Sequence, residues 1–378
     1  MPDAPSGSSG GSSTVEIGRR LGGGGLPRWG AASYPRAMTD MYLRPIPLTD
    51  PAHGDDGVRL AGGWVRFTHM ERLSRSAPPE VISVRDLSPE TLAPFVTARA
   101  PIAGLSLDRP RLMGIVNVTP DSFSNAGQHA ACDAAVAGAV HMLAEGADLI
   151  DIGGESTRPG AQDVSPDAEI ARVLPVIAAL RAQGIAAPIS LDTRKSGVAT
   201  AGLGAGGDVI NDVSGLRFDP DLARVAANTG APLILMHSIG TPQTMQAMAP
   251  DAYDDVVLDV YDGLACAVAQ AEAAGVARAR IMVDPGIGFG KTHDQNLAIL
   301  RRLSLFHGLG CGVLLGVSRK GMIGAIAGEP VAAKRGPGSA AIGLWGVAQG
   351  MQMLRVHDMG THRQALQLWQ ALAVPPGT

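Results

Sequence analysis

The sequence has few cysteines, no excess of basic side chains and no long uncharged apolar run, and each shortage excludes a class of protein. Its 378 residues include three cysteines, which lie far apart without a Cys-X-X-Cys pair, so neither a disulfide framework nor a zinc site is expected. The net charge of −4 argues against a nucleic-acid surface, which normally carries a basic excess. No uncharged apolar run reaches the roughly 18 residues of a membrane span. We therefore expect a cytoplasmic protein without nucleic-acid or membrane partners.

What the chain does contain is apolar material for a large core, 46% of all residues. Residues 1–40 are rich in Gly and Ser and lack apolar periodicity, so we expect a disordered tail there. Residues 41–110 carry proline clusters and two strand-like stretches, at 63–69 and 81–86. They predict a small appendage with one or two strands, to which the sequence assigns no chemistry.

From residue 111 onward, short apolar runs alternate with Ala-rich helical stretches. The runs lack polar alternation, as expected for parallel strands covered on both faces. Eight such repeats over residues 111–373 predict an α/β fold, a (β/α)8 TIM barrel. A doubly wound sheet is the structural alternative, although it normally needs fewer strands. The runs are 112–118, 148–153, 188–193, 208–213, 232–237, 280–286, 313–318 and 353–358.

Polar residues fall near the carboxyl end of almost every run. In a barrel these ends meet at one mouth, where active sites are built. One polar strand end is ordinarily a capped loop, but so many buried polar groups on one rim would demand partners. The pattern predicts a functional site formed by Asn117, Asp151, Asp192, Asn211, His237, Asp284, Ser318, Arg355 and His357.

The strings at these strand ends are distinctive and occur in a fixed order. They resemble the dihydropteroate synthase family, the pterin-binding barrel enzymes of folate biosynthesis, over residues 111–373. The resemblance implies that the chain condenses 6-hydroxymethyl-7,8-dihydropterin pyrophosphate with p-aminobenzoate, using Mg²⁺ and acting as a homodimer. The strings are MGIVNVTPDSFSNAG (113–127), GADLIDIGGESTRPGA (146–161), ISLDTRKSGVA (189–199), INDVSG (210–215), DPGIGFGKTHDQNLAIL (284–300), GVSRKGMIG (316–324) and RVHD (355–358).

A pterin edge carries N–H donors beside a carbonyl, so its buried recognition needs acceptors and one mixed donor/acceptor group. Asp192, Asn211 and Asp284 offer this set, and the resemblance makes them the pterin-binding residues. The alternatives are that Asp192 caps the helix beginning near Lys195 and that Asp284 is only a turn residue.

Two further residues are assigned to the pterin by the resemblance. Lys320 would donate to ring acceptors, cover the ring with its stem and act in catalysis. Phe289 would line the pocket. Their alternatives are a solvated loop lysine and a core aromatic residue.

Arg355 and His357 alternate on the last strand and therefore point to one face. Arg binds phosphate through two bonds, and His adds a donor. The resemblance assigns both residues to the pyrophosphate and to catalysis, with Thr157 as a further contact and Asn117 as a ligand of Mg²⁺. On this assignment, loss of Arg355 should spare the affinity for a pterin without phosphates. The alternative is a structural ion pair of Arg355 with Asp358 or another loop acid.

Two loops complete the expected site. In the first, Asp121 is the candidate for stabilising a carbocation-like carbon as the C–O bond breaks. In the second, Thr157, Arg158 and Pro159 would form the p-aminobenzoate site, and Ser318 would meet the carboxylate of that substrate. The protein then acts by position and charge, without a nucleophilic side chain.

Two other functions compete with this one. A methyltetrahydrofolate methyltransferase would share the pterin-binding carboxylates but have no use for the Arg355/His357 pair. A non-catalytic paralogue that binds pterin should have lost loop or anion residues. For the homodimer, the apolar stretch 336–349 is the expected contact.

Overall fold

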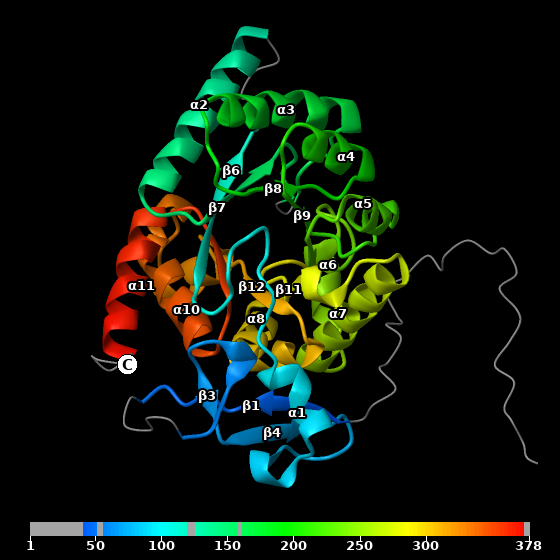
Figure 1. Ribbon diagram of the computed structural model, residues 1–378, viewed down its shortest axis with the longest axis vertical. Helices are drawn as coiled ribbons and strands as arrows, with labels where there is room; N and C mark the ends of the chain where they lie inside the picture. Colours follow the sequence, from blue (N-terminus) through cyan, green and yellow to red (C-terminus); the bar gives the residue numbers. More distant parts are fainter. Residues whose placement is uncertain (1–40, 51–55, 119–124, 158–159, 374–378) are drawn as a thin grey trace, which may run out of the picture.

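The computed structural model describes residues 41–50, 56–118, 125–157 and 160–373, with the side chains of 125–129 excepted. Eight parallel strands form a closed barrel in which β13 pairs with β6, Leu354 opposite Leu112 (Figure 1). The predicted (β/α)8 barrel is therefore confirmed. Its strands are β6 (Arg111–Asn117), β7 (Leu149–Gly153), β8 (Ile189–Asp192), β9 (Val209–Asp212), β10 (Leu233–Met236), β11 (Ile281–Asp284), β12 (Gly312–Leu315) and β13 (Met353–Val356).

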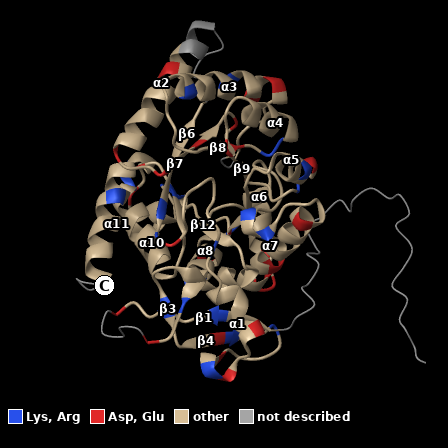
Figure 2. Cartoon of the chain, in the orientation of Figure 1, with Lys and Arg blue, Asp and Glu red and all other residues tan. Residues whose placement is uncertain are grey.

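Helices follow the strands and surround the barrel (Figure 1). Side-chain caps fix several helix starts: Ser165 accepts the Ala168 N–H before α3, and Thr292 and Gln295 form a capping box before α8. The helices of the barrel are α2 (Asn125–Ala144), α3 (Pro166–Ala182), α4 (Ser196–Gly204), α5 (Asp221–Thr229), α6 (Met245–Met248), α7 (Val256–Ala273), α8 (His293–Leu300), α9 (Gly321–Ala327), α10 (Gly336–Ala348) and α11 (Met359–Ala373). In Figure 2, acidic and basic residues are interspersed over the elements, in keeping with the small net charge.

The amino-terminal half of the barrel interior is filled by apolar side chains. Residues such as Met113, Leu149 and Met353 come from different strands and pack in one buried cluster. Ile102 and Leu107 join this cluster from outside the barrel and close its lower end. The barrel can therefore hold a ligand only at the carboxyl ends of its strands, as is usual for this fold.

The expected appendage contains more strands than the one or two that its sequence indicates. The additional strands are two to four residues long, too short for a periodic pattern to reveal them. A three-stranded antiparallel sheet has the order β1-β4-β5, and a two-stranded ribbon joins β2 and β3. The elements are β1 (Tyr42–Pro45), β2 (Val58–Arg59), β3 (Arg66–Phe67), β4 (His69–Leu73), β5 (Glu80–Ser83) and α1 (Pro89–Val96).

This appendage is attached to the barrel on the side away from the strand carboxyl ends (Figure 1). Tyr42 Oη donates to the buried Asp262 of α7 at 2.9 Å, and Ser304 Oγ donates to the Pro45 carbonyl at 2.7 Å. Ser304 lies in the segment before β12, so the contact is with the lower part of the barrel. The predicted tail, residues 1–40, lies outside the described residues. Within the described chain, no helix combines the length and apolar character of a membrane span.

Candidate active site

A cavity of about 750 Å³ opens at the carboxyl ends of the barrel strands. Every described residue to which the sequence assigns an individual role lines this one cavity, whereas Asp151 and His237, which the strand-end pattern also included, do not line it. The lining residues with assigned roles are Asn117, Thr157, Asp192, Asn211, Asp284, Phe289, Ser318, Lys320, Arg355 and His357. The remaining three, Asp121, Arg158 and Pro159, lie outside the described residues.

Three strand ends place acceptors at the bottom of the cavity. Asp192 and Asn211 are direct neighbours on β8 and β9, and Asp284 ends β11. Each is at most 7% exposed. Asp192 caps no helix, because the first N–H of α4, on Ser196, is accepted by Asp219 instead. Asp284 accepts the Gly286 N–H at 2.7 Å and lines the cavity as well, so it is both a turn residue and a pocket residue.

Arg355 connects two of the buried carboxylates. Its Nε donates to Asp151 Oδ2 at 2.6 Å and its Nη2 to Asp192 Oδ2 at 2.5 Å. Asp358, the partner considered in the structural alternative, pairs with Arg319. The guanidinium is therefore held against the floor of the cavity rather than at the loop.

Asp151 is a residue of the site to which the sequence assigned no individual role. It is fully buried at the third position of β7, and its Oδ2 also accepts from Asn211 Nδ2 at 3.1 Å. One carboxylate thus fixes both Arg355 and the amide of Asn211, leaving the Asn211 carbonyl oxygen as an acceptor for a ligand. Its sequence signal is an acid inside the apolar run 148–153, since a buried carboxylate requires a partner. The identity of that partner depends on barrel closure.

Burial controls the charge of the cavity floor. It raises the pKa of Asp192 to about 7, a rise that Arg355 opposes and that Asp151 and Glu169 reinforce. Burial likewise raises the pKa of Asp284, while the Gly286 N–H and Lys320 lower it. The carboxyl group of Asp192 therefore changes charge much closer to neutral pH than an exposed aspartate would, and the pKa of Asp284 is shifted in the same direction.

One wall of the cavity is formed by Phe289 and Lys320. The Lys320 Nζ lies 3.9 Å from the centroid of the Phe289 ring, and both residues line the cavity. Phe289 is partly exposed rather than part of the core, and Lys320 directly precedes α9. A flat ligand can lie between this wall and the acceptors below it.

Lys291 is a second residue without a sequence assignment. Its buried Nζ donates to the carbonyls of Gly286 and Phe289, each at 3.0 Å, and lies 3.1 Å from His237 Nδ1. Burial lowers its pKa well below the ordinary value. Lys291 thereby fixes the turn that carries Phe289, while His237 packs beneath the cavity rather than lining it. A lysine that gathers backbone carbonyls leaves no pattern in a sequence.

Ser318 and His357 form a pair that also lines the cavity. The Ser318 Oγ accepts the His357 backbone N–H at 3.0 Å and lies 3.0 Å from His357 Nδ1. The residue assigned to p-aminobenzoate therefore positions a residue assigned to pyrophosphate. Asn117 lines the same cavity from the end of β6, the strand next to β13.

Comparison of the chain with known proteins agrees with this arrangement. The family model described as "Pterin binding enzyme" matches residues 113–357. The dihydropteroate synthase of Neisseria meningitidis serogroup C is 45% identical over 273 residues, which is 71% of this chain and 95% of that protein. The dihydropteroate synthase of Escherichia coli K12 is 42% identical over 267 residues, which is 71% of this chain and 93% of that protein.

Solved structures give the same result. The Xanthomonas albilineans dihydropteroate synthase with 4-aminobenzoic acid has a TM-score of 0.67 and 45% identity, and the match covers 74% of this chain and 99% of that one. The complex of that enzyme with 7,8-dihydropteroate has a TM-score of 0.65 and 42% sequence identity, and the match covers 74% of this chain and 100% of that one. Residues 41–112, including the appendage, lie outside the family match.

Proposed function

This chain belongs to the pterin-binding enzyme family, and from that premise we propose how its cavity makes 7,8-dihydropteroate. The protein is a transferase of folate biosynthesis that condenses 6-hydroxymethyl-7,8-dihydropterin pyrophosphate with p-aminobenzoate and releases pyrophosphate. The observation that carries the proposal is the convergence of Asp192, Asn211 and Asp284 with Lys320 and Arg355 in one cavity.

The cavity floor binds the pterin ring. Asp192 and Asp284 accept the N–H groups of the pterin edge, and the Asn211 carbonyl oxygen adds a third acceptor. Lys320 donates to ring acceptors on the other side, above Phe289. Because all three acceptors are buried, a ligand without the matching donors would leave them without partners, which gives specificity.

The pyrophosphate group extends from Arg355 on the cavity floor toward His357 and Thr157, which supply its further contacts. Charge grows on the leaving pyrophosphate as the C–O bond breaks, so donors aimed at it stabilise the transition state more than the bound substrate. The dihydropterin ring stabilises the cationic carbon that remains, and Asp121 is the acidic residue proposed to face it. The amine of p-aminobenzoate then attacks this carbon and loses a proton.

Magnesium fits the donor set at the rim. Among the described residues, no three His, Cys, Asp or Glu side chains form a metal site. Asn117 offers one amide oxygen, which suits an ion that takes its other ligands from phosphate oxygens and water. When bound, Mg²⁺ would neutralise charge on the leaving group. We assign its protein contact to Asn117.

The p-aminobenzoate site lies between the loop after β7 and the loop after β12. We assign Thr157, Arg158 and Pro159 to p-aminobenzoate binding from the first loop, and Ser318 to its carboxylate from the second. Ser318 is 6% exposed and already oriented by His357, which supports a fixed anion contact.

The protein acts as a homodimer through α10. On this helix Pro337, Ala341 and Trp345 recur every four residues and are exposed, and Trp345 is 50% exposed. An apolar stripe on a barrel helix is typical of a subunit contact. We place the protein in the cytoplasm, because its three free cysteines suit a reducing compartment.

Complementation of a synthase-deficient bacterial strain tests the proposal. The chain should restore growth without added folate products, and Asp284→Ala should not. Failure of the wild-type chain to complement, with soluble protein present and pterin bound, would instead support a non-catalytic paralogue. Methyl transfer from methyltetrahydrofolate by the purified protein would support the methyltransferase alternative.

A further inference from the structure

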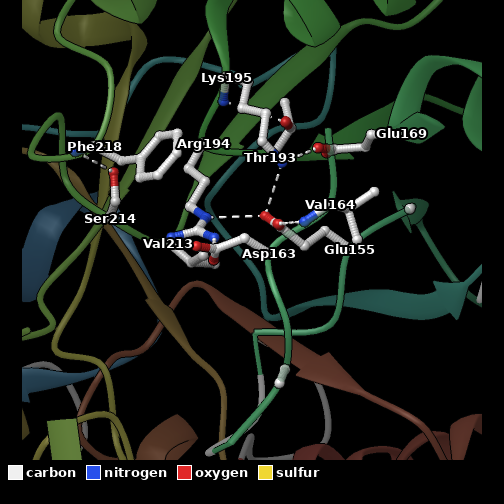
Figure 3. A network of polar contacts seen from close by, with 12 residues as sticks. Glu155, Asp163, Val164, Glu169, Thr193, Arg194, Lys195, Val213, Ser214 and Phe218 are labelled. Carbon is white, nitrogen blue, oxygen red and sulfur yellow. Dashed lines mark hydrogen bonds and ion pairs between the residues drawn. The ribbon is translucent and has the colours of Figure 1, made fainter. Parts of the chain in front are cut away.

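A network of charged side chains joins the described parts of the segment between β7 and α3, residues 154–157 and 160–165, to the residues that follow β8 (Figure 3). Its centre is Glu155, whose side chain is 3% exposed. Glu155 Oε2 accepts from Arg194 Nε at 2.9 Å and lies 3.0 Å from Lys195 Nζ. Glu155 Oε1 accepts the Val164 backbone N–H at 2.8 Å. Both oxygens are therefore engaged, and the carboxylate serves as an anchor.

Arg194 joins the two ends of this segment. Its Nε bonds to Glu155 near the start, and its Nη2 bonds to Asp163 near the end at 2.8 Å. The two contacts use different nitrogens of one planar guanidinium, a geometry that a lysine cannot reproduce. Thr157, which lines the cavity, lies between the two ends. The network therefore sets the path of the segment that carries Thr157.

The Arg194 guanidinium is itself held in place by an aromatic ring. Its guanidinium lies 4.2 Å from the centroid of the Phe218 ring, in the loop after β9. The neighbouring Lys195 bonds to Glu169 of α3 at 2.5 Å. Both basic residues directly follow Thr193, after the end of β8, so the chain that leaves this strand carries the side chains that hold the segment (Figure 3).

The far side of the segment has separate contacts. The Gly160 N–H donates to the Pro242 carbonyl at 2.9 Å, and Gln243 Nε2 donates to the Ala161 carbonyl at 2.6 Å. These residues belong to the region between β10 and α6. The segment is therefore held on one side by charged side chains and on the other by hydrogen bonds to its backbone groups.

Glu155 is charged at neutral pH. Burial alone would raise its pKa, but hydrogen bonds from Arg194, the Val164 N–H and Lys195 together hold the pKa below the ordinary value. An ionised Glu155 keeps both cations oriented. Loss of one cation leaves a buried charge with fewer partners, which is costly.

We infer that Arg194 is a positioning residue for the second substrate: through Glu155 and Asp163 it holds the described residues 154–157 and 160–165, and with them Thr157, in the arrangement that binds p-aminobenzoate. This inference rests on the proposed function. Arg194 itself does not line the cavity, so it acts through the segment rather than by touching either substrate. The pterin acceptors have their own support in Asp151 and Arg355 and do not depend on this bridge.

The test is steady-state kinetics of purified Arg194→Lys with both substrates varied. This variant keeps the charge but loses the two-point bridge. We expect the KM for p-aminobenzoate to rise about tenfold, while kcat and the affinity for the pterin stay close to the wild-type values. Asp163→Asn removes one end of the bridge from a side chain that is 64% exposed, so it should fold normally and raise the same KM by a smaller factor.

Asp262→Asn is the matched control, because it breaks a buried ion pair with Arg75 in the appendage contact. It should lower the melting temperature without changing the KM for p-aminobenzoate. An unchanged KM in both Arg194→Lys and Asp163→Asn would overturn the inference, as would equal losses for both substrates in proportion to stability. Absence of product from the wild-type protein would defeat the proposed function, and the inference with it. Wild-type turnover with insensitive variants would defeat the inference alone.

Discussion

Arg355 Nη2 lies 2.5 Å from Asp192 Oδ2, so a residue assigned to the leaving group also contacts a residue assigned to the pterin. The same guanidinium bonds to Asp151, which in turn holds Asn211. On the proposed assignment, the two halves of the first substrate therefore contact one charge network. A change at the pyrophosphate end must alter the charge of the pterin floor.

Arg355→Gln should impair both the turnover of the enzyme and its binding of the pterin ring. Turnover should fall by about 10²-fold or more, as expected for loss of a preorganised charge-stabilising donor. Arg355 lowers the pKa of Asp192, which burial has raised to about 7. Without the arginine this pKa should rise further, so the affinity for a pterin lacking phosphates should also fall and recover only at higher pH.

Calorimetry with a pterin lacking phosphates, across the neutral pH range, measures the expected loss of pterin affinity. The sequence alone led to the expectation that bare-pterin affinity would survive, and the contact with Asp192 changes that expectation. An unchanged pH profile of binding in Arg355→Gln would show that the contact does not control Asp192.

Asp192 should also affect stability, with a defined sign. Its pKa in the folded protein is about 7, against roughly 3.9 for an unfolded aspartate. The folded state binds the extra proton between these values, so the contribution of this group to the free energy of unfolding falls as pH rises through that window and is constant above it. Asp192→Asn should flatten that part of the stability curve and weaken pterin binding.

Urea unfolding of the wild type and Asp192→Asn at a series of pH values measures the difference. Asp219→Asn is a suitable control, because that carboxylate is half-buried and accepts the first N–H of α4 instead of lining the cavity. A wild-type stability curve that rises between pH 4 and 7 relative to Asp192→Asn would contradict the predicted sign.

The architecture was largely predictable from the chain. A strand such as 149–153 is buried at all five positions and therefore reads as a continuous apolar run. Eight such runs with helical spacers leave few topologies other than a barrel. The strands of the appendage escaped prediction, because β2 and β3 have two residues each and depend on their partners.

The sequence predicts which residues line the site, but not which of them contact one another. Asp192, Asn211 and Asp284 stand at strand ends and carry motifs, so their positions follow from the sequence. Asp151 and Lys291 were left without roles, because the groups that they hold come together only on closure of the barrel. The salt bridge between Arg194 and Glu155 spans 39 positions of the chain and has no local signature.

Tyr42→Phe should destabilise the protein without affecting catalysis. The Tyr42 hydroxyl donates to the buried Asp262, and loss of a hydrogen bond to a charged group costs about 1–3 kcal/mol.

Removal of residues 1–40 should by contrast leave stability nearly unchanged, because their composition offers little apolar surface to bury. Thermal unfolding and kcat of both variants decide this. A large drop in melting temperature on removal of residues 1–40 would refute the second expectation.

Ala341→Glu should dissociate the proposed dimer. Ala341 lies in the exposed apolar stripe of α10, and a buried charge without a partner is unfavourable at a subunit contact. Ala137→Glu, at an exposed alanine of α2, is the matched control and should leave the dimer intact. Light scattering at micromolar concentration measures the mass. A monomeric wild-type protein, or dissociation of the control alone, would place the contact elsewhere or remove it.

The most direct test of the account is the stoichiometry of the reaction catalysed by the purified protein. With dihydropterin pyrophosphate, p-aminobenzoate and Mg²⁺, the wild type should release one pyrophosphate for each 7,8-dihydropteroate formed. Asp284→Ala should lose this activity together with pterin affinity, because it removes an acceptor from the floor of the cavity. Pyrophosphate released without dihydropteroate, or full activity in Asp284→Ala, would contradict the assignment of the cavity.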